Sequence, residues 1–585
     1  MTKERTEAPA PKPLRLWPGI AVAILAGLIR YLLPIVGPES ALPTALFSGM
    51  IGALLVVVWW LFLSRAPWVE RLGVLAALVA VFFVSRALLH ESIATAAMGM
   101  LYPMYALPTL ALALVLGAVI GRSFPTPRRL AVMAAALVIA GGAWTLTRTT
   151  GVSGGFDWDF AWRWSETAED RLLAEAGAGG DPRGRSAVNV ATETAPEWPG
   201  FRGPGRNGIV HATRIETDWA SSPPAELWRR PVGPGWSSFA VHGDLLYTQE
   251  QRGEEEAVSC YRLSTGEPVW RHTDPVRFWE AMAGAGPRST PTLGGDGRVY
   301  ALGATGILNA LDAGDGSVVW SRDLADELDA TLPGWGFAGS PLVIQDTVIA
   351  AVAGQLAAYD RMTGELRWTG PVGRDSYGSP HALTIDGIPQ VLLLSGNALI
   401  SLAPADGEVL WQHEWPGFHS LQPAVNGDGE GGGDLVIGNA DSSGGVGARR
   451  LAVSHGEAGW KIEERWTSRG LKPYFNDFVL HEGHAYGFDG RILSAIDLEN
   501  GERRWKGGRW GHGQLVLLPD QDLLLVLSEK GEIGLVAARP DGFDELARLP
   551  AIEGKTWNHP VVVDDLLLVR NAEEMAAFRL PRASG

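Results

Sequence analysis

Residues 311–320 read LDAGDGSVVW, in which an acidic turn ends at Gly316 and a tryptophan, Trp320, follows four residues later. The same glycine-to-tryptophan spacing recurs in GEPVW at 266–270, GELRW at 364–368, GEVLW at 407–411, GEAGW at 456–460 and GERRW at 501–505. A glycine after a polar turn supplies the positive φ that a tight hairpin needs. Each copy therefore predicts a strand, a turn and a second strand that carries the tryptophan.

The distance between copies predicts the fold. Successive tryptophans lie about 42 to 50 residues apart, which is room for about four short strands and their turns, at Trp228, Trp270, Trp320, Trp368, Trp411, Trp460 and Trp505. Segments such as TVIAAVAGQLAAYD are rich in strand-forming residues and too short for paired helices. We expect an all-β propeller of eight blades, in which AELWRR at 225–230 completes the C-terminal blade and leaves no free edge.

Charge and hydropathy separate an N-terminal part from this repeat. Residues 1–150 carry 12 Lys and Arg against 5 Asp and Glu, and the rest of the chain is acidic, which gives the net charge of −16. Five apolar stretches, each about long enough to cross a bilayer as a helix, lie at 16–36, 42–63, 72–90, 103–120 and 130–147. The sequence predicts a five-helix membrane anchor, and its acidic balance argues against a nucleic-acid partner.

The short loops of this anchor predict its orientation. Basic residues gather in the N-terminal tail and in the second and fourth loops, at Lys3, Arg5, Lys12, Arg15, Arg65, Arg71, Arg122, Arg128 and Arg129. Because basic loops stay on the cytoplasmic side, five crossings would place the propeller outside. We expect a multi-pass protein of the cytoplasmic (inner) membrane, with its propeller on the periplasmic or extracellular side and membrane lipid around 1–150.

The expected domains are therefore an anchor at 1–150, a linker at 151–197 and a propeller at 198–580. Within the linker, WRWSETAEDRLLAEAG predicts a short amphipathic helix, and the rest reads as a flexible tether. The aromatic residues Trp158, Trp162 and Trp164 fit either an interfacial belt or a packed helix cap.

The LDAGDGSVVW pattern resembles the tryptophan-docking repeat of the pyrroloquinoline-quinone (PQQ) repeat propellers. WPGFRGPGRNG at 198–208 resembles the opening segment of bacterial PQQ-like propeller proteins. This resemblance implies the quinoprotein-like fold but not an activity, because the repeat occurs both in quinoprotein dehydrogenases and in the lipoprotein of the outer-membrane β-barrel assembly machinery. The helical anchor resembles membrane-bound quinoprotein glucose dehydrogenase in layout, without a shared motif in the helices.

Candidate site residues lie just before each innermost strand, because these loops open together at one mouth of the central channel. Besides small turn residues, these loops carry Trp236, Arg288, Trp335, Tyr377, His381, His419, Lys472, Tyr474, Asn476, Asp477, His512, Lys555, Trp557, Asn558 and His559. Aromatic and cationic groups together favour an anion or a planar ligand. The alternative is that each residue merely begins a strand or packs a blade.

Two functions remain open from the sequence. A quinoprotein dehydrogenase acting on a sugar or alcohol would use PQQ and Ca²⁺, with Asp477 as the catalytic base. Binding of that cofactor would fall to Arg288, Trp335, Lys472, Asn476, Trp557, Asn558 and His559. Against this function, Asp477 is the only carboxylate in the loop segments, and no adjacent cysteine pair or CxxCH haem motif is present. We favour a binding or scaffolding module with a protein or small-molecule ligand at the mouth, and expect no metal-ligand motif.

Overall fold

The computed structural model describes residues 13–36, 41–155, 157–179, 188–190, 194–374, 376–417, 419–427, 433–439 and 447–583. The predicted basic residues Lys3, Arg5 and Lys12, most of the first helix loop and part of the tether lie outside these ranges. Two compact units divide the chain. Unit 1 comprises 1–152, 158–165 and 280–283, and unit 2 comprises 153–157, 166–279 and 284–585.

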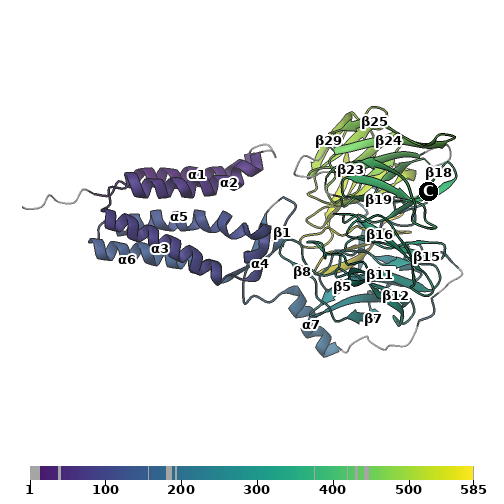
Figure 1. Ribbon diagram of the computed structural model, residues 1–585, viewed down its shortest axis with the longest axis horizontal. Helices are drawn as coiled ribbons and strands as arrows, with labels where there is room; N and C mark the ends of the chain where they lie inside the picture. Colours follow the sequence, from purple (N-terminus) through teal and green to yellow (C-terminus); the bar gives the residue numbers. More distant parts are fainter. Residues whose placement is uncertain are drawn as a thin grey trace, which may run out of the picture. The chain divides into compact units, whose positions relative to one another are not determined.

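Unit 1 is helical. Its helices are α1 (Trp17–Val36), α2 (Leu42–Val58) continued by η2 (Trp59–Leu63), α3 (Trp68–Ala87), α4 (Glu91–Thr95), η3 (Ala96–Gly99), α5 (Leu101–Gly121) and α6 (Thr126–Thr145). A hairpin of β1 (Thr147–Val152) and β2 (Trp158–Trp162) follows them (Figure 1). The five long helices match the five predicted apolar stretches, although α3 and α6 each begin four residues earlier than expected.

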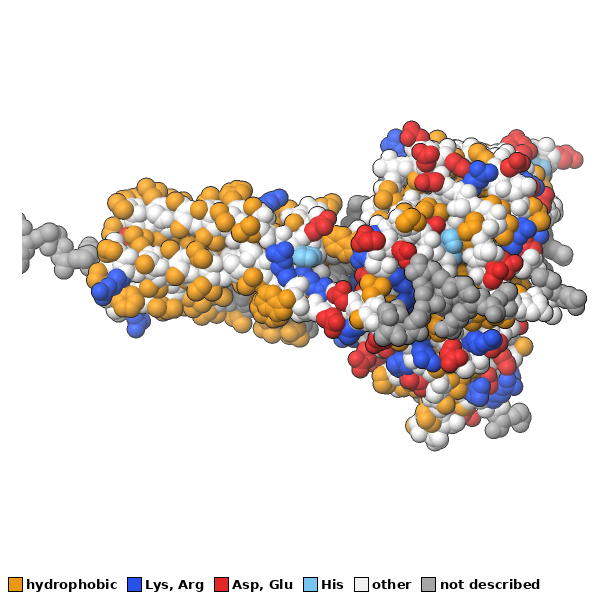
Figure 2. Space-filling view, turned by 90° about the horizontal axis from the view of Figure 1, so that it is seen from below, with side chains coloured by type: hydrophobic (Ala, Val, Ile, Leu, Met, Phe, Trp, Pro, Cys, Tyr) orange, Lys and Arg blue, Asp and Glu red, His pale blue; other side chains and the backbone are white. Residues whose placement is uncertain are grey.

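The long helices of unit 1 have the composition of membrane spans. Four of them are long and apolar enough to cross a bilayer, at Thr44–Leu63, Trp68–Ala87, Leu101–Gly121 and Thr126–Thr145, and α1 contains a shorter apolar stretch at Trp17–Leu33. Figure 2 shows hydrophobic side chains covering the visible surface of these helices, whereas acidic and basic side chains are spread over the propeller. Exposed apolar residues such as Leu54, Phe83 and Ile139 contribute to this surface.

Unit 2 contains eight four-stranded antiparallel sheets, the blades of the propeller. Blades 1 to 4 are β4 (Ala240–His242), β5 (Leu245–Arg252), β6 (Glu255–Arg262) and β7 (Pro268–Asp274); β10 (Thr292–Leu293), β11 (Arg298–Leu302), β12 (Ile307–Asp312) and β13 (Val318–Asp323); β14 (Leu342–Ile344), β15 (Thr347–Val352), β16 (Gln355–Asp360) and β17 (Leu366–Thr369); and β18 (His381–Ile385), β19 (Ile388–Ser395), β20 (Ala398–Leu402) and β21 (Val409–Glu414).

Blades 5 to 8 follow in the same order. They are β22 (Ala424–Asn426), β23 (Gly433–Asn439), β24 (Gly447–Gly456) and β25 (Gly459–Ser468); β26 (Val479–His481), β27 (His484–Asp489), β28 (Ile492–Asp497) and β29 (Arg503–Arg509); β30 (Gln514–Leu518), β31 (Leu523–Leu527), β32 (Glu532–Ala537) and β33 (Glu545–Pro550); and β34 (Val561–Val563), β35 (Leu566–Arg570), β36 (Glu574–Arg579) and β3 (Ala225–Pro231). Short elements outside the blades are α7 (Ala168–Gly179), α8 (Leu324–Glu327), η4 (Pro519–Gln521), β8 (Trp279–Glu280) and β9 (Gly284–Ala285).

The ring closes as the sequence predicts. Strand β3, which contains AELWRR, pairs antiparallel with β36 and becomes the outermost strand of the last blade. Trp228 of this strand donates its indole N–H to Leu263 O of blade 1 at 2.8 Å. The eight-bladed propeller preceded by helices is thereby confirmed.

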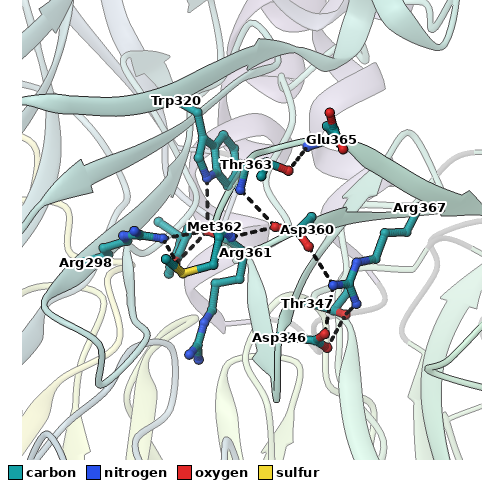
Figure 3. A network of polar contacts seen from close by, with 11 residues as sticks. Arg298, Trp320, Asp346, Thr347, Asp360, Arg361, Met362, Thr363, Glu365 and Arg367 are labelled. Atoms are coloured by element: carbon teal, nitrogen blue, oxygen red, sulfur yellow. Dashed lines mark hydrogen bonds and ion pairs between the residues drawn. The ribbon is translucent and has the colours of Figure 1, made fainter.

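Most docking tryptophans bond one blade to the next, as Trp320 shows. The indole N–H of Trp320 in blade 2 donates to Arg361 O in the outer turn of blade 3 at 3.0 Å (Figure 3). Gly364 of that turn has φ of 69°, and a Cβ there would lie 2.6 Å from the Trp320 ring. Only glycine therefore fits both the turn and the ring, which is why the two residues recur together.

An aspartate organises the same turn. The Asp360 carboxylate accepts the backbone N–H groups of Met362 at 2.8 Å and Thr363 at 2.9 Å. Arg367 bridges Asp360 to Asp346 at 2.6 and 2.8 Å. These contacts, drawn in Figure 3, fix the turn that receives Trp320.

The predicted register is wrong in blade 5. Trp466, and not Trp460, occupies the docking position there: its N–H donates to Leu498 O at 2.8 Å, and its ring covers Gly501 of the next blade. Strands β24 and β25 are each ten residues long, so Trp460 lies in their extended hairpin beside His455. The GEAGW motif therefore marks the tip of a lengthened hairpin.

We expect this difference to appear in stability. Trp466→Ala should lower the free energy of unfolding of the propeller by about 3–5 kcal/mol, because truncating a large docked aromatic leaves a cavity. Trp460→Ala should cost less, about 1–2 kcal/mol, because this ring is only partly buried and packs beside Trp411 at the edge of the core between blades 4 and 5. Denaturant unfolding of the full chain in detergent micelles measures both, and equal losses would contradict the assignment.

Candidate functional site at the propeller channel

Hydrogen bonds join the channel loops of the first four blades. The backbone N–H of Ser238 in blade 1 donates to Thr290 Oγ1 in blade 2 at 3.0 Å. Thr290 N–H donates to Ser340 Oγ in blade 3, and Ser340 N–H donates to Ser379 Oγ in blade 4, both at 2.9 Å. Small hydroxyl residues before the inner strands are therefore inter-blade acceptors.

Two predicted site residues belong to the same ring of bonds. Asp477 Oδ1 in blade 6 accepts the N–H of Gln422 in blade 5 at 3.0 Å. Asn558 Nδ2 in blade 8 donates to Ser237 O in blade 1 at 2.7 Å. Both side chains are almost fully buried. Both residues connect neighbouring blades. From the sequence, such a packing role was the alternative to ligand binding.

The segment at 198–209, here called the plug, lies across one end of the channel. Trp198 pairs with Val241 of blade 1, and Ile209 forms a parallel bridge with Leu517 of blade 7. Leu293 N–H of blade 2 donates to Pro199 O at 2.7 Å. The backbone of the plug meets the inner strands toward their far ends, and its Arg202 and Arg206 side chains reach residues that precede those strands.

Two buried arginines fix the plug from within. Arg202 donates to Phe478 O at 2.9 Å and approaches Asp477 to 3.5 Å, and Arg206 donates to Pro341 O and Ser340 O at 2.9 and 3.1 Å. Both arginines have positive φ, 61° and 50°. A non-glycine residue adopts this conformation only when its surroundings compensate the strain, and these bonds do so.

Burial controls the charges in the channel. It raises the pKa of Asp477 despite the nearby Arg202 guanidinium, and it lowers the pKa of Arg206 to about 9. Burial, reinforced by the arginines, lowers the pKa values of His381 and His559 to about 3. Both imidazoles are therefore neutral at neutral pH.

Other predicted ligand residues already have protein partners. Arg288 lies over the Phe278 ring, 4.6 Å from its centroid, and donates to Gly284 O at 3.0 Å. Lys472 pairs with Asp489 at 3.1 Å. The Asn476 side-chain carbonyl accepts the N–H of Tyr474 at 3.0 Å, which fixes its orientation.

The structure does bring aromatic residues together at the mouth. Trp236 and Trp557 lie 4.8 Å apart between ring centroids, and Phe475 lies 5.1 Å from Trp557. Lys555 Nζ sits 4.5 Å from the Trp557 ring. These four residues, here called the aromatic cluster, come from blades 1, 6 and 8, and all are partly exposed. A second pair, Trp335 and Tyr377, lies 5.7 Å apart between blades 3 and 4.

Glu529 anchors the aromatic cluster. Its carboxylate accepts the Trp557 indole N–H at 2.8 Å and the backbone N–H of His512 at 3.2 Å. The backbone N–H of Gly154, also part of unit 2, donates to the same carboxylate at 2.5 Å. The residues at 153–155 therefore contact the edge of the mouth, beside His512.

These positions do not fit a calcium and quinone centre. A Ca²⁺ ion takes six to eight hard oxygen ligands, but the Asp477 carboxylate is buried, faces Arg202 and accepts a backbone N–H. A base must be within reach of its substrate, whereas this carboxylate is only 4% exposed and is taken up by protein partners. As placed, the residues form a blade junction and an aromatic surface.

Three contributors were missed from the sequence. Arg202 and Arg206 lie in the quoted WPGFRGPGRNG segment, but nothing local shows that they point into a channel. Glu529 belongs to the hairpin turn between β31 and β32 of blade 7, away from the loops that precede the inner strands. The sequence signal at the arginines is that they lie four residues apart in a segment rich in glycine and proline, where turns are expected.

Comparison with known proteins identifies the family. The PQQ_2 family model, described as outer membrane protein assembly factor BamB, matches residues 219–386 and 304–538. Together these matches span more than half of the chain. The chain belongs to the PQQ_2 family. Outer membrane protein assembly factor BamB of Yersinia pestis is 23% identical over 344 residues, which cover 55% of this chain and 81% of that protein.

Solved structures agree on the PQQ_2 propeller fold. A europium-containing methanol dehydrogenase aligns with a TM-score of 0.51 and 12% identity, over 66% of this chain and 99% of that one. BamB from Moraxella catarrhalis aligns with a TM-score of 0.44 and 14% identity, over 62% and 99%. The likeness to the methanol dehydrogenase concerns the fold alone and leaves the activity undecided.

The neutral histidines predict a pH dependence. Because the pKa of His559 falls from 6.5 to about 3 on folding, the unfolded chain binds more protons between these values. Stability should therefore fall as the pH is lowered through this window, by about 1.4 kcal/mol per pH unit for each such histidine. Replacing His559 with Gln should reduce this slope in denaturant unfolding of the full chain.

The exposed His211 provides the matched control for this measurement. His211→Gln should leave the slope unchanged, because its side chain is largely open to solvent. An identical slope in wild type and His559→Gln would show that the buried imidazole titrates as in the unfolded chain.

Proposed function

We propose that this PQQ_2 protein is a membrane-anchored, exported propeller that acts as a binding or scaffolding module. The observation that carries the proposal is the aromatic cluster at an otherwise closed channel. Partly exposed tryptophans are typical anchors of protein interfaces. The similarity to the assembly factor BamB supports a protein partner.

The different roles of the buried and the exposed residues of the channel support the same proposal. Asp477, Asn558 and the channel serines bond neighbouring blades, and the plug fills the far end. Side chains that keep exposed surface are those at the mouth, Trp236, Phe475 and Trp557 with Lys555. A rigid rim that presents aromatic faces binds a partner without rearranging the blades.

The proposed orientation has support from unit 1. Arg129 at the start of α6 donates to Glu70 at the start of α3, with Nε 3.0 Å from Oε2. Arg15, before α1, donates its backbone N–H to Ser64 O at the end of η2 at 2.9 Å. These contacts bring the basic tail and the two basic loops to one end of the unit, as cytoplasmic loops require.

A photo-crosslinking amino acid at Trp335 or Tyr377 tests the partner surface. In native membranes, these positions should give a discrete crosslinked protein, because they line the mouth between blades 3 and 4. The matched control is Val409, which is exposed on the outer strand β21 and should give none. Trp557→Ala should reduce crosslinking from Trp335 about tenfold or more, as loss of a binding anchor does.

Equal crosslinking from Val409 and from the mouth would contradict the proposal. A parallel assay adds PQQ and Ca²⁺ to the purified protein with sugars or alcohols and an artificial electron acceptor. We expect no turnover, because Asp477 is occupied by Gln422 and Arg202. Turnover that Asp477→Asn abolishes would instead establish an oxidoreductase.

Reporter fusions test the orientation. An enzyme that is active only outside the cytoplasm should be active when fused after residue 150, since five crossings follow a cytoplasmic N-terminus. A fusion after residue 67, within the basic second loop, is the matched control and should be inactive. The reverse pattern would overturn the topology.

A further inference from the structure

A cavity of about 250 Å³ lies where the plug meets the inner strands of blades 2 and 3. Its walls come from the plug, from the ends of β10 and β14 and from the docking turn of blade 3. The lining residues are Pro199, Gly200, Gly203, Pro204, Arg206, Thr292, Leu293, Gly294, Leu342, Val343, Gln345 and Arg361. All of them belong to unit 2, at the end of the channel opposite the aromatic cluster.

The charge of this cavity has one sign. Among the described residues that line it, Arg206 and Arg361 are the charged ones, and no carboxylate is among them. A second cavity of about 470 Å³, beside α7, differs: it combines Arg171, Arg229 and Arg230 with Glu175, Glu553, Glu573 and Glu574. The cavity at the plug is therefore complementary to an anion. In the cavity beside α7, glutamates balance the charge of the arginines.

Arg206 retains an unused donor. Its two terminal nitrogens bind Pro341 O and Ser340 O, but its buried Nε–H has no hydrogen-bond partner among the described residues. The side chain is only 8% exposed. A buried donor without an acceptor costs free energy, and an anion in the cavity would supply the acceptor.

Arg361 contributes a second cation from a rigid position. Its backbone carbonyl receives Trp320, and Figure 3 shows its side chain extending away from that tryptophan. Asp296 lies 3.3 Å from its Nε and compensates part of its charge. The Arg361 guanidinium is therefore held at the cavity wall and is partly neutralised by Asp296. Arg206 binds backbone carbonyls, so its positive charge is less compensated.

The remaining walls define the rest of the ligand. Leu293, Leu342 and Val343, with the two plug prolines, give an apolar lining next to the arginines. Guanidinium groups bind carboxylates through charge-assisted hydrogen bonds, and the apolar wall favours a hydrocarbon group beside the charge. An inorganic anion would leave that wall uncovered.

We propose that this cavity binds a carboxylate attached to a small apolar group, through Arg206 and Arg361. A free branched organic acid and the C-terminal carboxylate of a polypeptide share this chemistry. The site does not depend on the function proposed above, because it lies at the opposite end of the channel from the aromatic cluster.

Isothermal titration of the full chain in detergent micelles tests the proposal. The probes are 4-methylpentanoate, the tripeptide Ala-Val-Leu, and the amide of each. At least one acid should bind, and its amide should bind at least about tenfold more weakly, since loss of the charge removes roughly 1.4 kcal/mol or more. Binding of the tripeptide alone would assign a polypeptide terminus, and binding of the small acid alone an organic acid.

The variants locate the binding. Arg361→Gln should weaken acid binding at least about tenfold, and Arg206→Lys should retain more affinity than Arg206→Gln. Arg367→Gln is the matched control: this arginine lies in the same blade and pairs with Asp346 and Asp360, but it does not line the cavity. If Arg206→Gln fails to fold, Arg361→Gln decides. Equal binding of acid and amide, or affinity unchanged in Arg361→Gln, would overturn the proposal.

Discussion

The contact between a tryptophan ring and the glycine turn of the next blade is the interaction on which this propeller depends. No strand ladder joins one sheet to the next in the described ring, so side chains must set the spacing between blades. Trp320 does this twice, because its ring covers Gly364 while its N–H binds the backbone at Arg361. Repeated at most blade junctions, as at Trp228, Trp270, Trp368, Trp466 and Trp505, the contact sets the spacing of the blades and with it the position of the inner loops.

A narrow channel then determines what its lining can do. Loops that converge at the axis bring many polar groups together away from water, and buried polar groups must find partners. In this chain they find one another: hydroxyl groups, Asn558 and Asp477 bond neighbouring blades, and the arginines of the plug bind carbonyls of blades 3 and 6. The hydrogen bonds of these polar residues therefore hold the ring and the plug together.

The sequence predicted the repeated features of the fold and not its local exceptions. Blade number and ring closure follow from the spacing of the tryptophans and from AELWRR, because both are encoded within a few residues. The sequence motif assigned the docking position of blade 5 to Trp460. The hairpin there is longer than in the other blades, which a motif of fixed length does not reveal, and Trp466 docks instead. Trp411 shows the consequence, since its N–H binds Gln390 of its own blade instead of the next one.

The candidate site was less predictable because its contacts join residues far apart in the sequence. The convergence of Trp236 and Trp557 follows from ring geometry and could be anticipated. The partner of Asp477 could not: Arg202 lies 275 residues away, and only the path of the plug brings it there. A carboxylate among aromatic loops looks catalytic in sequence, yet the same carboxylate beside a buried arginine fastens the plug. In this fold the axis is taken up by contacts between blades, so the groups left over lie at its two ends: partly exposed aromatic rings at one, and at the other a cavity lined by Arg206, whose buried Nε–H has no partner among the described residues.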